Sequence, residues 1–174
     1  KKMCFLLVLS QIIIGAGAFV VSSPVVLTRQ KPLRALPLPS ESLSDEASLA
    51  IVMDALAVND SPHPNAGLEV CFNFSNDMCR AAVGGSLDAF VAYASNPTFQ
   101  SLVDHKDWQY KLSSRMKKAK FRGAMSTFVV DVEKKLGGRR KFLFTLEQQR
   151  RPPLQNCWLV RECLAVDKAI YQTV

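Results

Sequence analysis

The sequence predicts an α+β fold in which three N-terminal helices pack on a curved, four-stranded antiparallel sheet. Between residues 41 and 105, apolar residues recur at helical spacing and are separated by loops rich in Pro, Asn and Gly. After residue 106, apolar and polar residues alternate as in half-buried strands, with short turns between the alternating segments. Because neither layer can bury its apolar face alone, we expect the helices to cover one face of the sheet.

Three segments fit amphipathic helices. The first can be capped by Ser42 or Ser44 and carries acidic residues in its first turn. The second alternates like a strand but also forms a helical stripe, and we expect a short helix because a helical hairpin is the simplest use of the loop before it. The third is capped by Ser86 and ends before Pro97. The expected helices span residues 42–58, 66–74 and 87–94.

Four segments fit the strands of an antiparallel meander. Each places apolar side chains on one face, and the connections are rich in basic residues, Gly and Pro. The expected strands span residues 108–116, 121–132, 141–148 and 157–166.

Residues 1–40 have the composition of two targeting signals in series. Residues 1–18 combine a basic start, an apolar run and a small-residue site, the three parts of a signal peptide, with a retained membrane anchor as the alternative. Residues 19–40 contain Ser, Thr, Pro and three basic residues but no acid, which is typical of a transit peptide. We therefore expect residues 41–174 to form the single folded domain.

The junction Ala18-Phe19 resembles the cleavage point in the two-part plastid presequence of diatoms and related algae. The resemblance implies a protein of a plastid (chloroplast) in an alga with a secondary plastid. A secreted protein with a Pro-rich leader is the alternative.

The formal charge of +7 is concentrated in the presequence. After residue 40 the chain holds 17 basic and 15 acidic residues, unevenly placed: residues 41–105 hold nine acids and one base, and residues 106–151 hold fourteen bases and four acids. This polarity does not suit a uniformly basic nucleic-acid binder. It suggests a homodimer or docking against a charged partner.

Neither a metal site nor a cofactor is expected. The domain holds Cys71, Cys79, Cys157 and Cys163, none in the paired spacing of a zinc site, and we expect free thiols. Its two histidines have no suitably spaced acid or thiol.

Two stretches of the domain resemble a family of uncharacterised plant and algal plastid proteins of the nuclear transport factor 2-like superfamily. They are Asn59-Asp60-x-Pro62-x-Pro64-Asn65-x-Gly67-Leu68-Glu69-Val70-x-Phe72-x-Phe74 and Trp158-Leu159-x-x-Glu162. The resemblance implies a cone-shaped, cystatin-like fold in which helices wrap a curved sheet. The superfamily includes ketosteroid isomerases, dehydratases and adaptor domains, so the resemblance does not determine the chemistry.

A general base in such a cone would lie on the concave face of the sheet. Asp131 shares strand parity with Met125 and Val129 and could point inward, but a solvated position near the strand end is the stronger interpretation. Glu162 shares parity with the apolar face of its strand, where we expect an ion pair or hydrogen bond with Arg122 or Tyr110. Neither carboxylate is assigned as catalytic.

The interior of the cone is expected near four residues, and the state of that interior separates two classes of function. An open apolar pocket with Glu162 or Asp131 at its floor would favour an enzyme, and a filled interior would remove that interpretation. The expected pocket residues are Tyr110, Phe144, Trp158 and Glu162.

Basic residues gather at two turns that a meander places at the same end of the sheet. They could dock an acidic protein or an anionic membrane surface, although solubility and edge protection are an equal alternative. We expect no exposed aromatic residues among them, so nucleic acid is an unfavoured partner. The expected docking surface comprises Arg115, Lys117, Lys118, Lys120, Arg150 and Arg151.

The function expected from the sequence is therefore that of a non-catalytic plastid binding or interaction module. The alternative is a small-molecule-binding protein, or an isomerase- or dehydratase-like enzyme that uses the interior of the cone.

Overall fold

A computed structural model describes residues 35–166, which belong to one compact unit. The expected signal peptide, most of the expected transit-like segment and the last eight residues of the expected domain lie outside the described residues. Leu36 and Leu43 pack against the hydrophobic core. The packed part of the chain therefore includes residues that precede Glu41.

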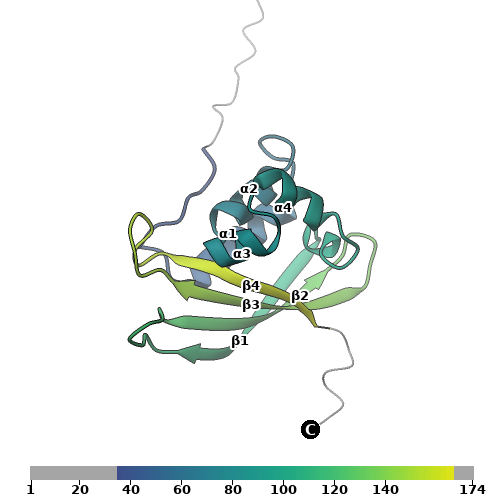
Figure 1. The fold of residues 1–174 in the computed structure, drawn as a ribbon. Helices are drawn as coiled ribbons and strands as arrows, with labels where there is room; N and C mark the ends of the chain where they lie inside the picture. The colour runs from purple at the N-terminus through teal and green to yellow at the C-terminus, as the bar shows by residue number, and fades with distance from the viewer. Residues whose placement is uncertain (1–34, 167–174) are drawn as a thin grey trace, which may run out of the picture. The chain divides into compact units, whose positions relative to one another are not determined.

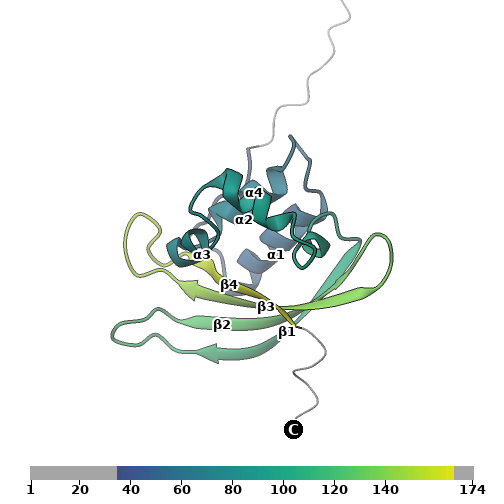
Figure 2. The same cartoon turned by 45° about the vertical axis from the view of Figure 1, so that its right-hand side comes forward.

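Within residues 35–166, four α-helices precede four strands, and the strands form one open antiparallel sheet in the order β1-β2-β3-β4. The helices lie together on one face of the twisted sheet (Figures 1 and 2). This confirms the α+β class and the antiparallel meander. The elements are α1 (Asp45–Ala57), α2 (Ala66–Asn73), α3 (Asp77–Ala82), α4 (Leu87–Ala94), the 3-10 helix η1 (Gln100–Leu102), β1 (Asp107–Met116), β2 (Met125–Glu133), β3 (Arg139–Gln148) and β4 (Trp158–Val166).

The helix starts follow the capping residues. The Ser44 hydroxyl accepts a hydrogen bond from the Ala47 N–H at 3.0 Å, and Ser86 caps α4 in the same way. The ambiguous second segment is the helix α2. The expectation of three helices is nevertheless wrong by one, because α3 was not anticipated: none of its six residues is buried, so it has no apolar stripe to reveal it.

The loop between α1 and α2 is closed by the side chain of Asn59, which is buried. Its Oδ1 accepts the Leu68 N–H at 3.1 Å, and its backbone carbonyl accepts the Gly67 N–H at 2.9 Å. A Cβ atom on Gly67 would lie 2.3 Å from the Ala55 carbonyl oxygen, so only glycine lets the two helices approach this closely. Polar residues of the loop thus fix the crossing of α1 over α2.

The core lies between the helices and one face of the sheet. Alternate residues of β2, from Ser126 to Val132, are buried under the helices, and the residues between them form an open face on the other side. The largest fully buried side chains are Phe74, Phe128, Phe142, Phe144, Leu49, Met53, Leu56 and Leu146.

A β-bulge in β4 reverses the expected orientation of its second half. Leu146 of β3 pairs with Val160 and Thr145 pairs with Glu162, which leaves Arg161 as an extra residue. Cys163, opposite the buried Phe144, therefore faces the helices, and Glu162 lies on the open face. The prediction that Glu162 shares the inner face with Val160 is wrong, because simple alternation cannot count across a bulge.

The outer edge of β4 is bonded to the link between α2 and α3. The Val160 N–H donates to the Phe74 carbonyl at 2.7 Å, and the Asn76 N–H donates to the Val160 carbonyl at 2.8 Å. This short parallel bridge holds the helical layer against the last strand of the sheet. It also pairs backbone groups that would otherwise form an exposed strand edge.

Candidate functional site

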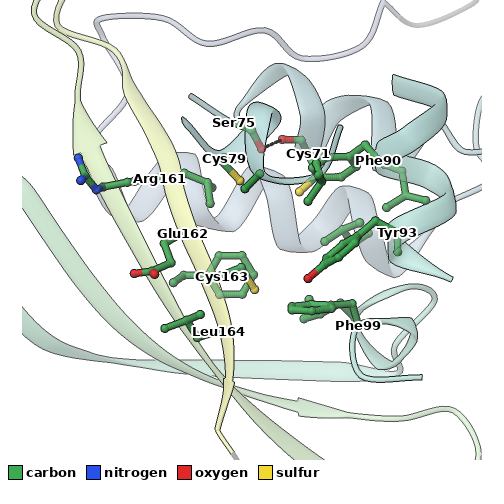
Figure 3. A pocket seen from close by; sticks show the side chains of 18 of the residues that line it. Cys71, Ser75, Cys79, Phe90, Tyr93, Phe99, Arg161, Glu162, Cys163 and Leu164 are labelled. Atoms are coloured by element: carbon green, nitrogen blue, oxygen red, sulfur yellow. Dashed lines mark hydrogen bonds between the residues drawn. The ribbon is translucent and has the colours of Figure 1, made fainter. Parts of the chain in front are cut away.

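A cavity of about 440 Å³ lies where the helical layer meets strands β3 and β4. Its volume falls within the range of about 300–1,000 Å³ that is usual for small-molecule sites. Side chains from α2, α3, α4, η1 and β4 surround it (Figure 3). Those that matter below are Cys71, Cys79, Phe90, Tyr93, Phe99 and Cys163.

Aromatic rings form the helical side of the cavity. Phe90 and Tyr93 come from α4, and the centroid of the Tyr93 ring lies 5.2 Å from that of Phe99, which in turn packs on the buried Phe142. The Tyr93 hydroxyl points toward β4 across the cavity (Figure 3). An apolar ligand would gain the hydrophobic and dispersion energy of these rings, and the hydroxyl is available for one directional contact.

Three thiols complete the lining. Burial raises the pKa of the Cys71 thiol to about 12, with a smaller contribution from the neighbouring thiol of Cys79. Burial likewise raises the pKa of Cys163 well above its ordinary value, and that of Cys79. All three are therefore neutral near pH 7, and a protonated thiol is a small, polarisable apolar group rather than a nucleophile.

The sequence analysis did not connect these three cysteines with the site. Cys71 and Cys79 lie four residues on either side of Ser75, whose hydroxyl donates to the Cys71 carbonyl at 2.8 Å (Figure 3). Helical spacing could not have brought them together, because Cys71 belongs to α2 and Cys79 to α3, with a non-helical link between the two helices. Cys163 could not have been found, because only the bulge at Arg161 turns it inward.

Two of the four expected pocket residues line the cavity and two do not. Phe144 forms part of its sheet wall, and Glu162 lies at its margin with the carboxylate directed away from the helices (Figure 3). Tyr110 lies on β1, where its ring stacks on Trp108 and its hydroxyl donates to Glu46 at 3.4 Å. Trp158 packs against the core outside the cavity lining.

The two weak catalytic candidates both lie on the open face of the sheet. Asp131 does share parity with Met125 and Val129, but that face is the one without helices, and its carboxylate accepts a hydrogen bond from Arg139 at 2.8 Å. For Glu162, the described residues show neither expected partner: Tyr110 bonds to Glu46, and the Nε of Arg122 is buried without a hydrogen bond.

Both histidines have structural partners. His63 lies in the α1–α2 loop with its Nε2 3.4 Å from a Glu69 carboxylate oxygen. His105 is buried, and its Nδ1 bonds the Leu102 carbonyl at 2.8 Å, at the end of η1. Within residues 35–166, no three His, Cys, Asp or Glu side chains are arranged to hold a metal ion.

The expected basic docking surface is divided by the structure. Arg115 turns toward α1, where it and Ser126 donate hydrogen bonds to the buried carboxylate of Asp45, the Arg115 contact being 2.7 Å long. Burial opposes ionisation of Asp45, but these two hydrogen bonds outweigh it and hold the pKa of that carboxyl below its usual value. Arg115 is exposed but ties the end of β1 to α1, whereas the exposed lysines after it have no carboxylate partner among the described residues.

Comparison of the chain with protein-family models, with curated proteins and with solved structures found no match. In the part of the chain that the structure describes, no helix has the length and apolar character to cross a bilayer. Function is therefore argued from the cavity and the surface themselves.

The raised thiol pKa values predict a loss of stability at alkaline pH. The folded chain holds the Cys71 proton more tightly than the unfolded chain does. The protonated thiol therefore contributes fully to the free energy of unfolding below pH 9, and this contribution falls as the pH rises from 9.0 toward about 12. The loss is about 1.4 kcal/mol per pH unit for one thiol. Urea unfolding of the wild type and of Cys71→Ala, between pH 8 and pH 10.5, should show a difference in free energy of unfolding that shrinks with pH. A difference independent of pH would contradict the assignment.

Proposed function

We propose that this protein binds a small apolar molecule in the cavity beside β4 and holds it without transforming it. The observation that carries the proposal is the lining: aromatic rings on the helical side, three neutral thiols and the apolar wall of the sheet. Such a surface recognises a ligand by shape and by burial of apolar area. The Tyr93 hydroxyl and the polar margin at β4 would orient the ligand rather than activate it.

The side chains around the cavity favour binding over catalysis. Among the described lining residues, the charged ones are Arg161 and Glu162, and both point away from the helices (Figure 3). A general base must come within about 3 Å of the proton that it removes. The thiols lie inside the cavity, but burial keeps them protonated.

We also propose that the protein works in the plastid of an alga with a secondary plastid. Support comes from the composition of residues 1–40 and from the Ala18-Phe19 junction. The curved sheet with helices on one face is compatible with the cone that the nuclear transport factor 2-like resemblance implies, and membership of that superfamily is part of the proposal.

The targeting proposal is tested by fusing residues 1–40 to a fluorescent protein in a diatom. The fusion should reach the plastid stroma, and Phe19→Ala should leave it outside the inner plastid membranes, because the residue after the cleavage site would no longer match the presequence pattern. Secretion of the unaltered fusion would contradict the plastid proposal and leave the cavity proposal untouched.

Filling the cavity should weaken binding. Cys163→Phe places a ring into the space from β4, so the affinity for the neutral fluorescent probe N-phenyl-1-naphthylamine should fall by about tenfold or more, equivalent to about 1.4 kcal/mol. Val129→Phe adds similar bulk to the open face of β2 and serves as the matched control, with unchanged affinity expected.

Fluorescence titration of both variants measures these affinities, and circular dichroism checks that each is folded. Equal probe affinity in Cys163→Phe and Val129→Phe would place the bound probe elsewhere and refute the proposed site. The same conclusion would follow if the folded wild type bound no apolar probe.

A further inference from the structure

The hairpin between β1 and β2 ends in a tight turn that projects Lys120 and Phe121. Ala119 and Arg122 are joined by two backbone hydrogen bonds, N–H to carbonyl in each direction, of 2.9 and 3.4 Å. The two residues between them therefore form the apex of a β-turn. The Phe121 side chain is 84% exposed, and the Lys120 ammonium lies 5.2 Å from the centroid of its ring.

Phe121 overturns two expectations from the sequence. It was expected in the second strand, but β2 begins only at Met125. It was also expected that no exposed aromatic residue would lie among the basic residues, whereas Phe121 lies between Lys120 and Arg122 at the apex. Met116 at the end of β1 is 43% exposed and adds a second apolar side chain to the same hairpin. The hairpin tip thus combines apolar and basic groups.

The positive charge at this tip is not compensated within the described chain. Among residues 35–166, no carboxylate lies within ion-pair distance of Lys117, Lys118 or Lys120. The turn between β3 and β4 adds Arg150 and Arg151, both exposed, at the same end of the sheet (Figure 1). A surface of this kind attracts an anionic partner over roughly a Debye length.

The opposite end of the sheet provides the contrast. The β2–β3 turn also carries basic residues and a fully exposed leucine, Leu136. There, however, Lys135 lies 3.6 Å from Asp104, and Arg139 bonds Asp131 at 2.8 Å and Glu133 at 3.3 Å. Carboxylates therefore compensate part of the positive charge at this end, which distinguishes it from the tip of the β1–β2 hairpin.

The base of the β1–β2 hairpin is held firmly, so its tip is presented in a fixed position. A Cβ atom on Gly123 would lie within the van der Waals radius of the Gln148 carbonyl oxygen, and the Gln148 N–H donates to the Ala124 carbonyl at 2.9 Å. On the other strand, Arg115 is bonded to Asp45 of α1. Docking through a preorganised tip costs little conformational entropy.

We propose that this tip docks the protein on an anionic membrane surface, with Phe121 inserted at the headgroup level and Lys117, Lys118 and Lys120 against the headgroups. The combination fits a bilayer because an interfacial site rewards an apolar ring and neighbouring cations together. An acidic protein would match the charge but offers no reason for an apolar apex. Single-stranded nucleic acid needs successive stacking rings along a groove, and here one ring projects from a convex turn. The inference does not depend on the cavity.

The position of Phe121 in the bilayer is tested in the full chain with two matched variants, Phe121→Trp and Leu136→Trp. Trp108 and Trp158 contribute equally to both, so the difference in quenching by brominated lipids reports the depth of the new tryptophan. With vesicles of phosphatidylcholine and phosphatidylglycerol, the Phe121→Trp signal should be quenched more strongly. With phosphatidylcholine alone, the difference should largely disappear.

The role of the lysines is tested by vesicle co-sedimentation of two triple variants. Lys117→Gln, Lys118→Gln and Lys120→Gln together should weaken partitioning into anionic vesicles by about a hundredfold, from roughly 1 kcal/mol for each lysine near the surface. Lys134→Gln, Lys135→Gln and Lys141→Gln remove the same charge elsewhere and should change it only a few-fold. Five of these six residues are exposed and Lys134 is half-buried, so the variants should fold.

Three results would overturn the proposal. One is equal quenching of the two introduced tryptophans, which would mean that another part of the chain makes the membrane contact. Another is an equal loss of partitioning in the two triple variants. The third is a result in which the wild type binds an oligonucleotide or an acidic polypeptide, the tip variants lose that binding, and the same variants bind vesicles as the wild type does.

Discussion

The backbone bridge between Val160 and the Phe74–Asn76 link is the contact on which the arrangement of this domain depends. β4 is an edge strand, and its free N–H and C=O groups at Val160 are paired with the chain segment that joins α2 to α3. One residue later the bulge at Arg161 turns Cys163 toward the same helices. Bridge and bulge together place the thiols of α2, α3 and β4 around a common space, and the cavity lies there, at the β4 edge. Under β2, phenylalanine side chains fill the core.

The two faces of the sheet separate the chemistry of the molecule. Around the cavity, the covered face holds neutral groups: aromatic rings, aliphatic side chains and thiols kept protonated by burial. The buried carboxylate of Asp45 lies apart from them, paired with Arg115 and Ser126. The open face holds both candidate carboxylates: Asp131 is bonded to Arg139, and Glu162 is exposed to solvent. A buried unpaired carboxylate would have cost several kcal/mol. This separation is the physical reason that the proposal is one of binding, and it leaves the hairpin ends as the sites where charge meets solvent.

Most of the secondary structure follows from local patterns, and most of the site does not. Ser44 and Ser86 cap helices where their spacing predicts, and the alternation of β2 and β3 identifies a buried face. The failures have specific causes. Helix α3 has no fully buried residue, the bulge at Arg161 inverts the parity of Glu162, and Phe121 belongs to a turn although its apolar character suits a strand. Periodicity reports which side chains are buried, so it cannot locate an exposed helix, an extra residue in a strand or a side chain left in water.

The structure of the protein with N-phenyl-1-naphthylamine bound would test the account of the cavity most directly. The account predicts that the probe lies between the Phe90 and Tyr93 rings and strand β4, in contact with the sulfur of Cys163, and that the bridge at Val160 remains in place. A probe bound only on the open face of the sheet or at a hairpin tip, with side chains closing the space beside β4, would contradict it.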